Sequence, residues 1–413
     1  MPDNSHDVLI IGAGLSGLSC ALELQKQGQK ILLLEKSDEP GGRVRTDNVD
    51  GFQLDRGFQV YLSAYPTAGR LLDLPALDLG HFEPGAMVYH EGKLHRVMDI
   101  FRRPQHLLAS ALAPIGGLMD KARVARLRWR VKNSSQEQIA NREDLSTEDY
   151  LRREGFSAQM IDRFFRSFYG GIFLERELQT SSRMFEFTFK MFTEGAATLP
   201  ALGMGQLSQQ LANRLPSESI RYQCPVKEVN GNQVTLSSGE ILEAATIVLA
   251  TPAHITSALL PDLDMPDLAW RSVTTLYFSA PKSPLDEAVI ALNGSGQGRV
   301  NNVAVLSDVR PEYAPKGQAL ISVSLLGTSE QADTPNLVKQ ELIHWFGKEV
   351  TDWKHLRTDL IPHALPDQKP NALPCPRPAP PLYLCGDYQT SASIEGAIIS
   401  GQDTARKILG LQK

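Results

Sequence analysis

Three glycines near the N-terminus have the spacing of a turn that binds a dinucleotide. Gly12, Gly14 and Gly17 follow a short apolar run (DVLII) that is typical of a buried strand. In such a turn the first glycine permits a tight bend, the second lets the backbone approach a pyrophosphate, and the third lets helix and strand pack closely. The N–H groups that open the next helix, at Leu15 and Ser16, are suited to phosphate oxygens. The residues therefore predict a nucleotide-phosphate site.

An acidic residue follows the next expected strand, where a bound nucleotide would present its ribose. The run Lys30–Leu34 predicts that strand, and Glu35 lies 18 residues beyond Gly17. A carboxylate there accepts hydrogen bonds from ribose hydroxyls and repels a 2′-phosphate. Strand, turn, helix, strand and acid form a complete Rossmann-type unit. The alternative is a glycine turn that closes a strand–helix junction without a ligand.

A second glycine pair with an arginine lies just beyond this unit. Gly41, Gly42 and Arg43 offer a flexible backbone and a permanent cation that could reach the dinucleotide. The alternative is a turn that carries a surface arginine.

A matching pattern occurs near the C-terminus. The apolar run Pro381–Cys385 predicts a strand that leads into Gly386 and Asp387, and the small-residue run Ser391–Gly401 opens a helix. The N–H groups of that opening could stabilise a second anionic region of a cofactor. The carboxylate of Asp387 could bind the hydroxyls of a ribose or ribityl chain.

These two ends together resemble the flavin amine oxidase superfamily, which includes protoporphyrinogen oxidases and phytoene desaturases. The resemblance rests on IGAGLSGL, Glu35 and GGR at one end and on YLCGD and SIEGAIISG at the other. The run GFQVYLSAYP, which begins at Gly57, is similar to the phytoene desaturase-like branch. A histidine common in that run is Gln59 here, so the substrate need not be phytoene.

The resemblance implies that the cofactor is FAD. Cys375 does not have the spacing of the cysteine that carries flavin covalently in monoamine oxidases, so we expect noncovalent binding. The resemblance also implies that the main chain at Val226 lies near the adenine. The residues expected to bind the cofactor are Gly12, Gly14, Leu15, Ser16, Gly17, Glu35, Lys36, Gly42, Arg43, Gly57, Phe58, Gln59, Val226, Gly386, Asp387, Ser393, Ile394, Glu395 and Ala397.

The expected fold is α/β, with a discontinuous Rossmann-type FAD-binding domain and an inserted α+β substrate-binding domain. Short strands expected at 219–225, 233–236 and 245–252 return the chain to the first domain. We assign residues 1–66, 206–264 and 376–413 to the FAD-binding domain. Residues 67–205 and 265–375 form the expected substrate-binding domain.

The expected reaction transfers a hydride from an apolar substrate C–H to flavin N5, a CH–CH oxidation or desaturation. The protein then needs only to bind, orient and exclude water, so no catalytic side chain is assigned. Many amine-oxidising members place a lysine near N5, and that position falls at Thr275 here, which favours an apolar substrate. A flavin amine oxidase and a non-redox flavin-dependent isomerase remain the alternatives.

Two segments of the expected substrate-binding domain have two interpretations each. The aromatic residues between Phe164 and Phe192 are either core or the wall of an apolar cavity. The helix expected at Leu118–Lys132 carries Leu118, Ala122, Ala125 and Trp129 on one face between basic side chains. It is either an ordinary solvated helix or a peripheral membrane contact.

Composition narrows the functional class. The 413 residues, 42% hydrophobic and 22% charged, are typical of a soluble protein of two domains. The net charge of −5 argues against a nucleic-acid partner. HExxH and CxxC motifs are absent, so we expect no metal site. The scattered cysteines, and the absence of a signal or transit peptide, predict a cytoplasmic protein, with a membrane-peripheral location as the alternative. The oligomeric state stays open.

Overall fold

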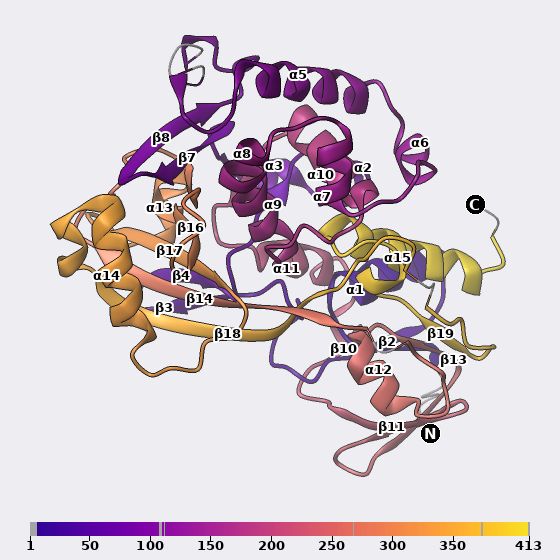
Figure 1. The fold of residues 1–413 in the computed structure, drawn as a ribbon. Coiled ribbons are helices and arrows are strands. Elements are labelled where there is room, and N and C mark those ends of the chain that lie inside the picture. Colours follow the sequence, from indigo (N-terminus) through magenta and orange to yellow (C-terminus); the bar gives the residue numbers. More distant parts are fainter. Residues whose placement is uncertain (1–5, 107–109, 111, 267, 373–374, 412–413) are drawn as a thin grey trace.

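The computed structural model describes residues 6–106, 110, 112–266, 268–372 and 375–411. The remaining residues, some of which belong to the expected domain segments, lie outside the described part of the chain. Two seven-stranded sheets organise the described residues, and two smaller sheets accompany them. Figure 1 shows the first sheet beside helices α1 and α15, with the second sheet at the other end of the molecule.

The first sheet has a parallel core in which strands from distant parts of the chain alternate. In spatial order these strands are β10 (Ile220–Arg221), β2 (Ile31–Leu34), β1 (His6–Ile11), β13 (Ile241–Leu249) and β19 (Leu382–Leu384). The antiparallel hairpin β11 (Val226–Asn230) and β12 (Gln233–Leu236) extends from β13. The central strands are apolar almost throughout because helices and other elements cover both faces.

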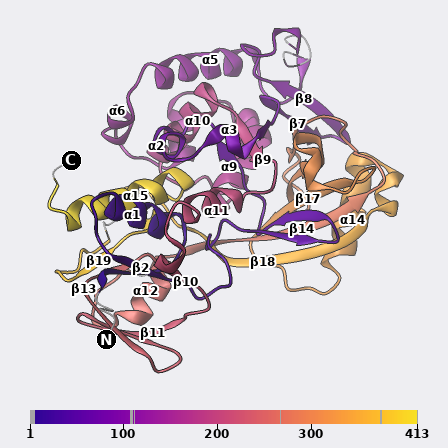
Figure 2. The same cartoon turned by 180° about the vertical axis from the view of Figure 1, so that it is seen from behind.

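Helices from the two ends of the chain pack side by side on this sheet. They are α1 (Leu15–Lys26) and α15 (Ile394–Ile408), which both views show in contact (Figures 1 and 2). A Cβ atom at Gly401 would lie 2.1 Å from the carbonyl oxygen of Ser16, so only glycine permits this approach. The hydroxyl of Ser19 donates to the carbonyl of Ile398 across the same contact. Helices α11 (Gln206–Ala212) and α12 (Ala253–Leu259) complete this part.

The second sheet is mixed and includes two long strands that reach toward the first. Its strands, in spatial order, are β18 (Lys354–Pro366), β14 (Trp270–Ala280), β17 (Ala319–Leu326), β16 (Val300–Val305), β15 (Ile290–Asn293), β7 (Gly85–His90) and β8 (Lys93–Met98). Helix α14 (Thr334–Phe346) packs on one face, where Leu342 and Trp345 belong to the same apolar cluster as Leu276 and Phe278.

Further helices lie beside the second sheet (Figure 1). They include α5 (Leu118–Lys132), α6 (Gln136–Ala140), α7 (Thr147–Arg153), α8 (Ala158–Met160), α9 (Arg166–Phe173) and α10 (Ser182–Glu194). The shorter elements include β3 (Thr46–Val49), β4 (Phe52–Asp55), β5 (Tyr61–Leu62), α2 (Pro66–Leu71), α3 (Leu74–Leu77), β6 (Leu79–His81), β9 (Ala197–Pro200) and α13 (Leu306–Val309). Of these, β3, β4 and α13 lie beside the second sheet in Figure 1. Among the described helices, none has the length and apolar character that crossing a bilayer requires.

The sheets agree with the expected division of the chain, which stays a prediction. Every strand of the first sheet comes from 1–66, 206–264 or 376–413, and every strand of the second from 67–205 or 265–375. One expected strand, 219–225, exists but is shorter than predicted. The strand β10 ends at Arg221 because the next N–H groups turn away, Gln223 donating to the Ser37 carbonyl and Cys224 to that of Glu35.

The aromatic segment is mainly core. Phe165, Tyr169, Phe173 and Phe185 are buried in one cluster, and the rings of Tyr169 and Phe185 lie 4.5 Å apart between centroids. This geometry is typical of packed aromatic pairs. The core interpretation therefore accounts for most of the segment.

A buried carboxylate ties the two halves of the molecule together. The side chain of Asp55 accepts hydrogen bonds from the Thr46 hydroxyl at 2.5 Å, the Met204 N–H at 2.9 Å and the Tyr313 hydroxyl at 2.9 Å. Its carbonyl accepts from the Tyr277 hydroxyl of β14 at 2.7 Å. Despite these donors, burial raises the pKa of Asp55 to about 6.

The raised pKa of Asp55 predicts a loss of stability as pH rises. The folded pKa lies above the unfolded value of 3.8, so the contribution is complete below pH ~4 and is lost as pH rises through about 6. The loss is roughly 3 kcal/mol. Asp55→Asn keeps the acceptor without the charge. Urea unfolding from pH 4.5 to 7.5 should show wild type losing stability relative to this variant, and a difference that does not change with pH would contradict the assignment.

Candidate cofactor site

The glycine turn has one position that no protein atom requires to be glycine. Gly12 has φ +106°, and a Cβ there would lie 2.9 Å from the Ala250 carbonyl oxygen. A Cβ at Gly17 would lie 2.0 Å from the Gly12 carbonyl oxygen. Gly14 has an ordinary extended backbone, φ −75°, and a Cβ there would meet nothing within 4 Å. The open space at Gly14 fits a ligand that approaches the backbone at the start of α1.

Glu35 lies at the carboxyl end of β2 and is fixed from two sides. Its carboxylate, 5% exposed, accepts the N–H groups of Ala13 and Ser37, both at 2.9 Å. Each carboxylate oxygen retains capacity to accept another hydrogen bond. The hydrogen bond from Cys224 N–H to the Glu35 carbonyl brings the chain just before Val226 to the same place. This arrangement fits a nucleoside whose ribose lies beside Glu35.

An ion pair joins the two predicted halves of the site. Arg43 Nη2 lies 2.6 Å from Asp387 Oδ1, and Arg43 Nη1 donates to the Ala364 carbonyl at 2.9 Å. A Cβ at Gly42 would lie 3.6 Å from the Cα of Gly14, which places the second glycine turn against the first. Residues more than 340 positions apart in sequence are thus in direct contact.

The side chains of Ser393 and Glu395, at the start of α15, form hydrogen bonds with the protein backbone. The Ser393 hydroxyl caps the helix by accepting the Gly396 N–H at 2.9 Å. The carboxylate of Glu395, 1% exposed, accepts the N–H groups of Thr67 at 2.8 Å and Ala68 at 2.9 Å. Glu395 therefore anchors the first turn of α2 to α15. Its place in the cofactor site stays a prediction.

The other predicted residues line the same region with less distinct roles. Gly57 has φ +89°, and a Cβ there would lie 2.6 Å from Ile361 Cδ1. The amide of Gln59 donates to the Arg43 carbonyl at 2.8 Å, so it supports the arginine turn. Half-buried Phe58, Ile394 and Ala397 pack against the core cluster of the first sheet, and Gly386 and Leu15 are buried.

Three aromatic residues that the sequence did not single out surround Arg43. Its guanidinium lies 5.7 Å from the ring centroid of Trp270. The rings of His254 and His363 stack at 4.0 Å, and both meet Trp270 edge-on. Burial, His363 and the nearby Lys36 and Arg43 cations lower the pKa of His254. Their positions on α12, β14 and β18 share no local motif, so no sequence signal groups them.

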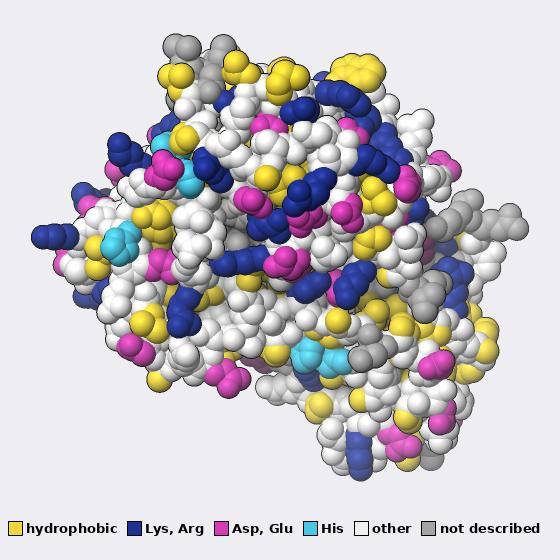
Figure 3. Space-filling view, viewed as in Figure 1, with side chains coloured by type: hydrophobic (Ala, Val, Ile, Leu, Met, Phe, Trp, Pro, Cys, Tyr) yellow, Lys and Arg dark blue, Asp and Glu magenta, His cyan; other side chains and the backbone are white. Residues whose placement is uncertain are grey.

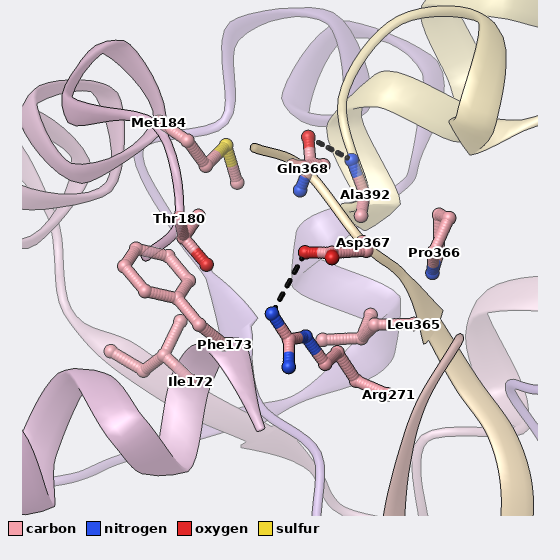
Figure 4. A pocket seen from close by; sticks show the side chains of 10 residues that line it. All are labelled: Ile172, Phe173, Thr180, Met184, Arg271, Leu365, Pro366, Asp367, Gln368 and Ala392. Carbon is pink, nitrogen blue, oxygen red and sulfur yellow. Dashed lines mark hydrogen bonds and ion pairs between the residues drawn. The ribbon is translucent and has the colours of Figure 1, made fainter. Parts of the chain in front are cut away.

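A pocket separates α9 and α10 from the C-terminal motif (Figure 4). Its enclosed volume is about 20 Å³, room for about one water molecule. Its lining residues are Ile172, Phe173, Thr180, Met184, Arg271, Leu365, Pro366, Asp367, Gln368 and Ala392. Arg271 and Asp367 form an ion pair at 3.0 Å, and the Gln368 side chain accepts the Ala392 N–H at 2.9 Å. Apolar side chains of α9, α10 and β18 thus lie beside the C-terminal motif, next to this polar pair and amide.

Thr275 presents a buried hydroxyl toward Gly57. The residue is fully buried in β14, and its Oγ1 makes no hydrogen bond within the described part of the protein. It lies 3.9 Å from the position that a Cβ of Gly57 would occupy. Buried hydroxyls without partners are costly, so this atom is suited to a ligand or a water molecule.

The described residues contain no group of three or more His, Cys, Asp or Glu side chains that could hold a metal ion. The four cysteines are free thiols, and Cys375 is buried.

The parallel sheet, the glycine turn and the meeting of the chain ends define a dinucleotide-binding oxidoreductase fold. The family model described as flavin containing amine oxidoreductase matches residues 15–409. The chain therefore belongs to this family and is a flavin-dependent oxidoreductase.

Relatives and solved structures agree on the family and the fold. The chain is 22% identical to 15-cis-phytoene desaturase of Capsicum annuum over 468 residues, which cover 99% of this chain and 78% of that protein. It is 33% identical to hydroxyneurosporene desaturase of Rubrivivax gelatinosus over 109 residues, 24% of this chain and 21% of that protein. Cyclohexylamine oxidase from Brevibacterium oxydans superposes with a TM-score of 0.67 at 18% identity, covering 98% of this chain and 99% of the other.

The two glycines Gly14 and Gly17 predict opposite effects of the same substitution. In Gly14→Ala the new methyl group meets no protein atom, so the flavin-free protein should unfold within about 0.5 kcal/mol of wild type. Its flavin affinity should fall by at least about tenfold, because the methyl group occupies the pyrophosphate position. Gly17→Ala should destabilise the fold by about 1–3 kcal/mol through the contact with Gly12. Flavin titration with urea unfolding measures both, and full flavin affinity in Gly14→Ala would exclude the site.

Proposed function

We propose that the chain binds FAD noncovalently and oxidises a CH–CH bond of an apolar, polyene-like or tetrapyrrole-like substrate. The observation that carries this proposal is the buried hydroxyl of Thr275 at the position where many amine-oxidising members of the superfamily have a lysine. A hydroxyl is neutral and shorter than a lysine side chain, so a water molecule beside it would have no cationic partner. The full-length similarity to 15-cis-phytoene desaturases points to the same class of substrate.

The residues at the chain ends fit FAD from adenosine to flavin. Glu35 would accept the ribose hydroxyls of the adenosine, and the open backbone at Gly14 would face the pyrophosphate. Asp387, held by Arg43, would accept hydroxyls of the ribityl chain. When bound, the flavin accepts a hydride from the substrate C–H at N5.

The remaining work of the protein is to hold the substrate and exclude water. The apolar side chains of Ile172, Phe173, Met184 and Leu365 lie beside the C-terminal motif and would contact an apolar substrate there. The Thr275 hydroxyl would hydrogen-bond the flavin or a water beside it, because its Oγ1 has no protein partner.

Unfolding the protein should release the cofactor chemically unchanged. Heat or acid precipitation of the purified protein should release all yellow colour into the supernatant, and chromatography should identify it as FAD. Retention of colour in the precipitate would contradict noncovalent binding. FMN in the supernatant would contradict the role of Glu35 as an acceptor for the adenosine ribose.

A substrate panel without oxygen should separate the chemical classes. Flavin absorbance should bleach with a detergent-solubilised polyene or a porphyrinogen and stay unchanged with mono- and diamines. Thr275→Lys serves as a matched variant, and its flavin content reports whether it folds. Bleaching by amines in wild type would contradict the proposal, as would bleaching by no CH–CH substrate on the panel. Activity that requires reduced flavin but consumes no reducing equivalents would identify an isomerase instead.

A further inference from the structure

Exposed apolar side chains gather on one surface of the molecule. Nine large hydrophobic residues are exposed within the described part of the chain, and five of them lie between positions 101 and 129. These five, called the docking face below, are Phe101, Leu112, Leu118, Met119 and Trp129. Trp129 is 71% exposed, which is unusual for tryptophan. Figure 3 shows yellow side chains along the edge of the molecule where Figure 1 places α5.

Helix α5 presents two different faces. Its exposed positions Leu118, Met119, Ala122 and Trp129 fall on one side of the helix, while Leu127 and Val131 are buried on the opposite side. The buried side packs into the aromatic cluster of α9 and α10. The exposed apolar side is therefore not needed for the core of the protein.

Hydrogen bonds fix both ends of α5, which carries three residues of the docking face. Asp120, 2% exposed, accepts the N–H groups of Gly117 at 2.9 Å and Ser157 at 2.8 Å, which fixes the start of α5. At the other end, Lys190 donates to the carbonyl oxygens of Val131 and Lys132 at 3.2 and 3.3 Å. The exposure of the apolar residues belongs to an ordered helix and not to a frayed end.

Basic side chains accompany the docking face. Helix α5 contains Lys121, Arg123, Arg126, Arg128, Arg130 and Lys132 against one acidic residue, Asp120. Arg126 is 72% exposed and lies on the apolar side, as does exposed Lys132. Arg128 pairs with Asp99 at 2.6 Å and places its guanidinium 5.1 Å from the ring of Phe101. Arg123 and Arg130 also pair with carboxylates, so Arg126 and Lys132 are the exposed cations that border the apolar side chains.

We propose that the docking face binds the headgroup region of an anionic lipid bilayer. An apolar face bordered by Lys and Arg suits the boundary between anionic headgroups and acyl chains, where tryptophan is also favoured. A second copy of the chain fits less well, because a two-fold contact through this face would bring like charges together. Attachment there would bring the helices that line the pocket close to hydrophobic molecules that are dissolved in the bilayer. The proposal does not depend on which substrate is oxidised.

Co-sedimentation of the full-length flavin-loaded protein with vesicles tests the docking face. Binding should be strong with vesicles of phosphatidylcholine and phosphatidylglycerol, weaker with phosphatidylcholine alone, and reduced by salt. Combining Leu118→Ser, Met119→Ser and Trp129→Ser should lower the affinity by more than about tenfold. The control variant Ile241→Ser removes a residue that is 58% exposed on the first sheet and should bind like wild type.

Quenching of tryptophan fluorescence by brominated lipids is a second test, which reports the position of Trp129 in the bilayer and not the binding affinity. These lipids should quench the fluorescence that Trp129→Phe removes, since Trp345 and Trp353 are buried and half-buried Trp270 lies beside Arg43 at the cofactor site. Absence of vesicle binding by wild type would overturn the proposal, and so would equal loss of binding in Ile241→Ser. A docking-face variant that changes the molar mass of the protein in analytical ultracentrifugation, but not its vesicle binding, would show a contact between copies of the chain instead. Flavin content and the unfolding midpoint identify any variant that fails to fold.

Discussion

The position of β13 between β1 and β19 is the constraint on which the site depends. It places the carboxyl ends of strands from the start, middle and end of the chain at one edge of a parallel sheet. Ligands of such sheets bind at that edge. Helix α1 follows β1 after the glycine turn, and α15 follows β19 after the segment that contains Gly386 and Asp387. Gly401 then lets their backbones approach, and Arg43 meets Asp387.

The second sheet is coupled to this edge through one face of β14. Tyr277 donates to the backbone of Asp55, while Thr275, two residues earlier, presents its hydroxyl toward Gly57. The alternate residues Leu276 and Phe278 face the core under α14. One strand therefore carries a structural hydrogen bond and a polar group for the cofactor region on the same side, as its two-residue period requires.

The sequence predicted what local spacing encodes. The glycine turn, Glu35, the C-terminal motif and the bounds of α5 all depend on neighbours within one or two elements, and the structure places them as expected. The family motifs assigned both chain ends to one site, but the ion pair between Arg43 and Asp387 was not predicted. Residues whose partners lie far away were not predictable. Asp55 is contacted by Tyr277 of β14, which lies more than 200 residues later in the sequence. Trp270, which contacts Arg43, belongs to the second sheet.

Glu395 shows a different limit. Its place within a cofactor motif suggested a cofactor role, yet its carboxylate satisfies the N–H groups that open α2. A short motif cannot separate a residue that touches a ligand from one that holds the motif in place, because both roles keep the same spacing. Only the hydrogen-bond partners distinguish them.

Hydrogen exchange of the flavin-free protein, with and without added FAD, tests the central claim most directly. A site built from both chain ends predicts that FAD slows amide exchange at the start of α1 and at the start of α15 together, with the segment around Glu35. Protection of only one chain end, or of neither at saturating FAD, would contradict the two-part site.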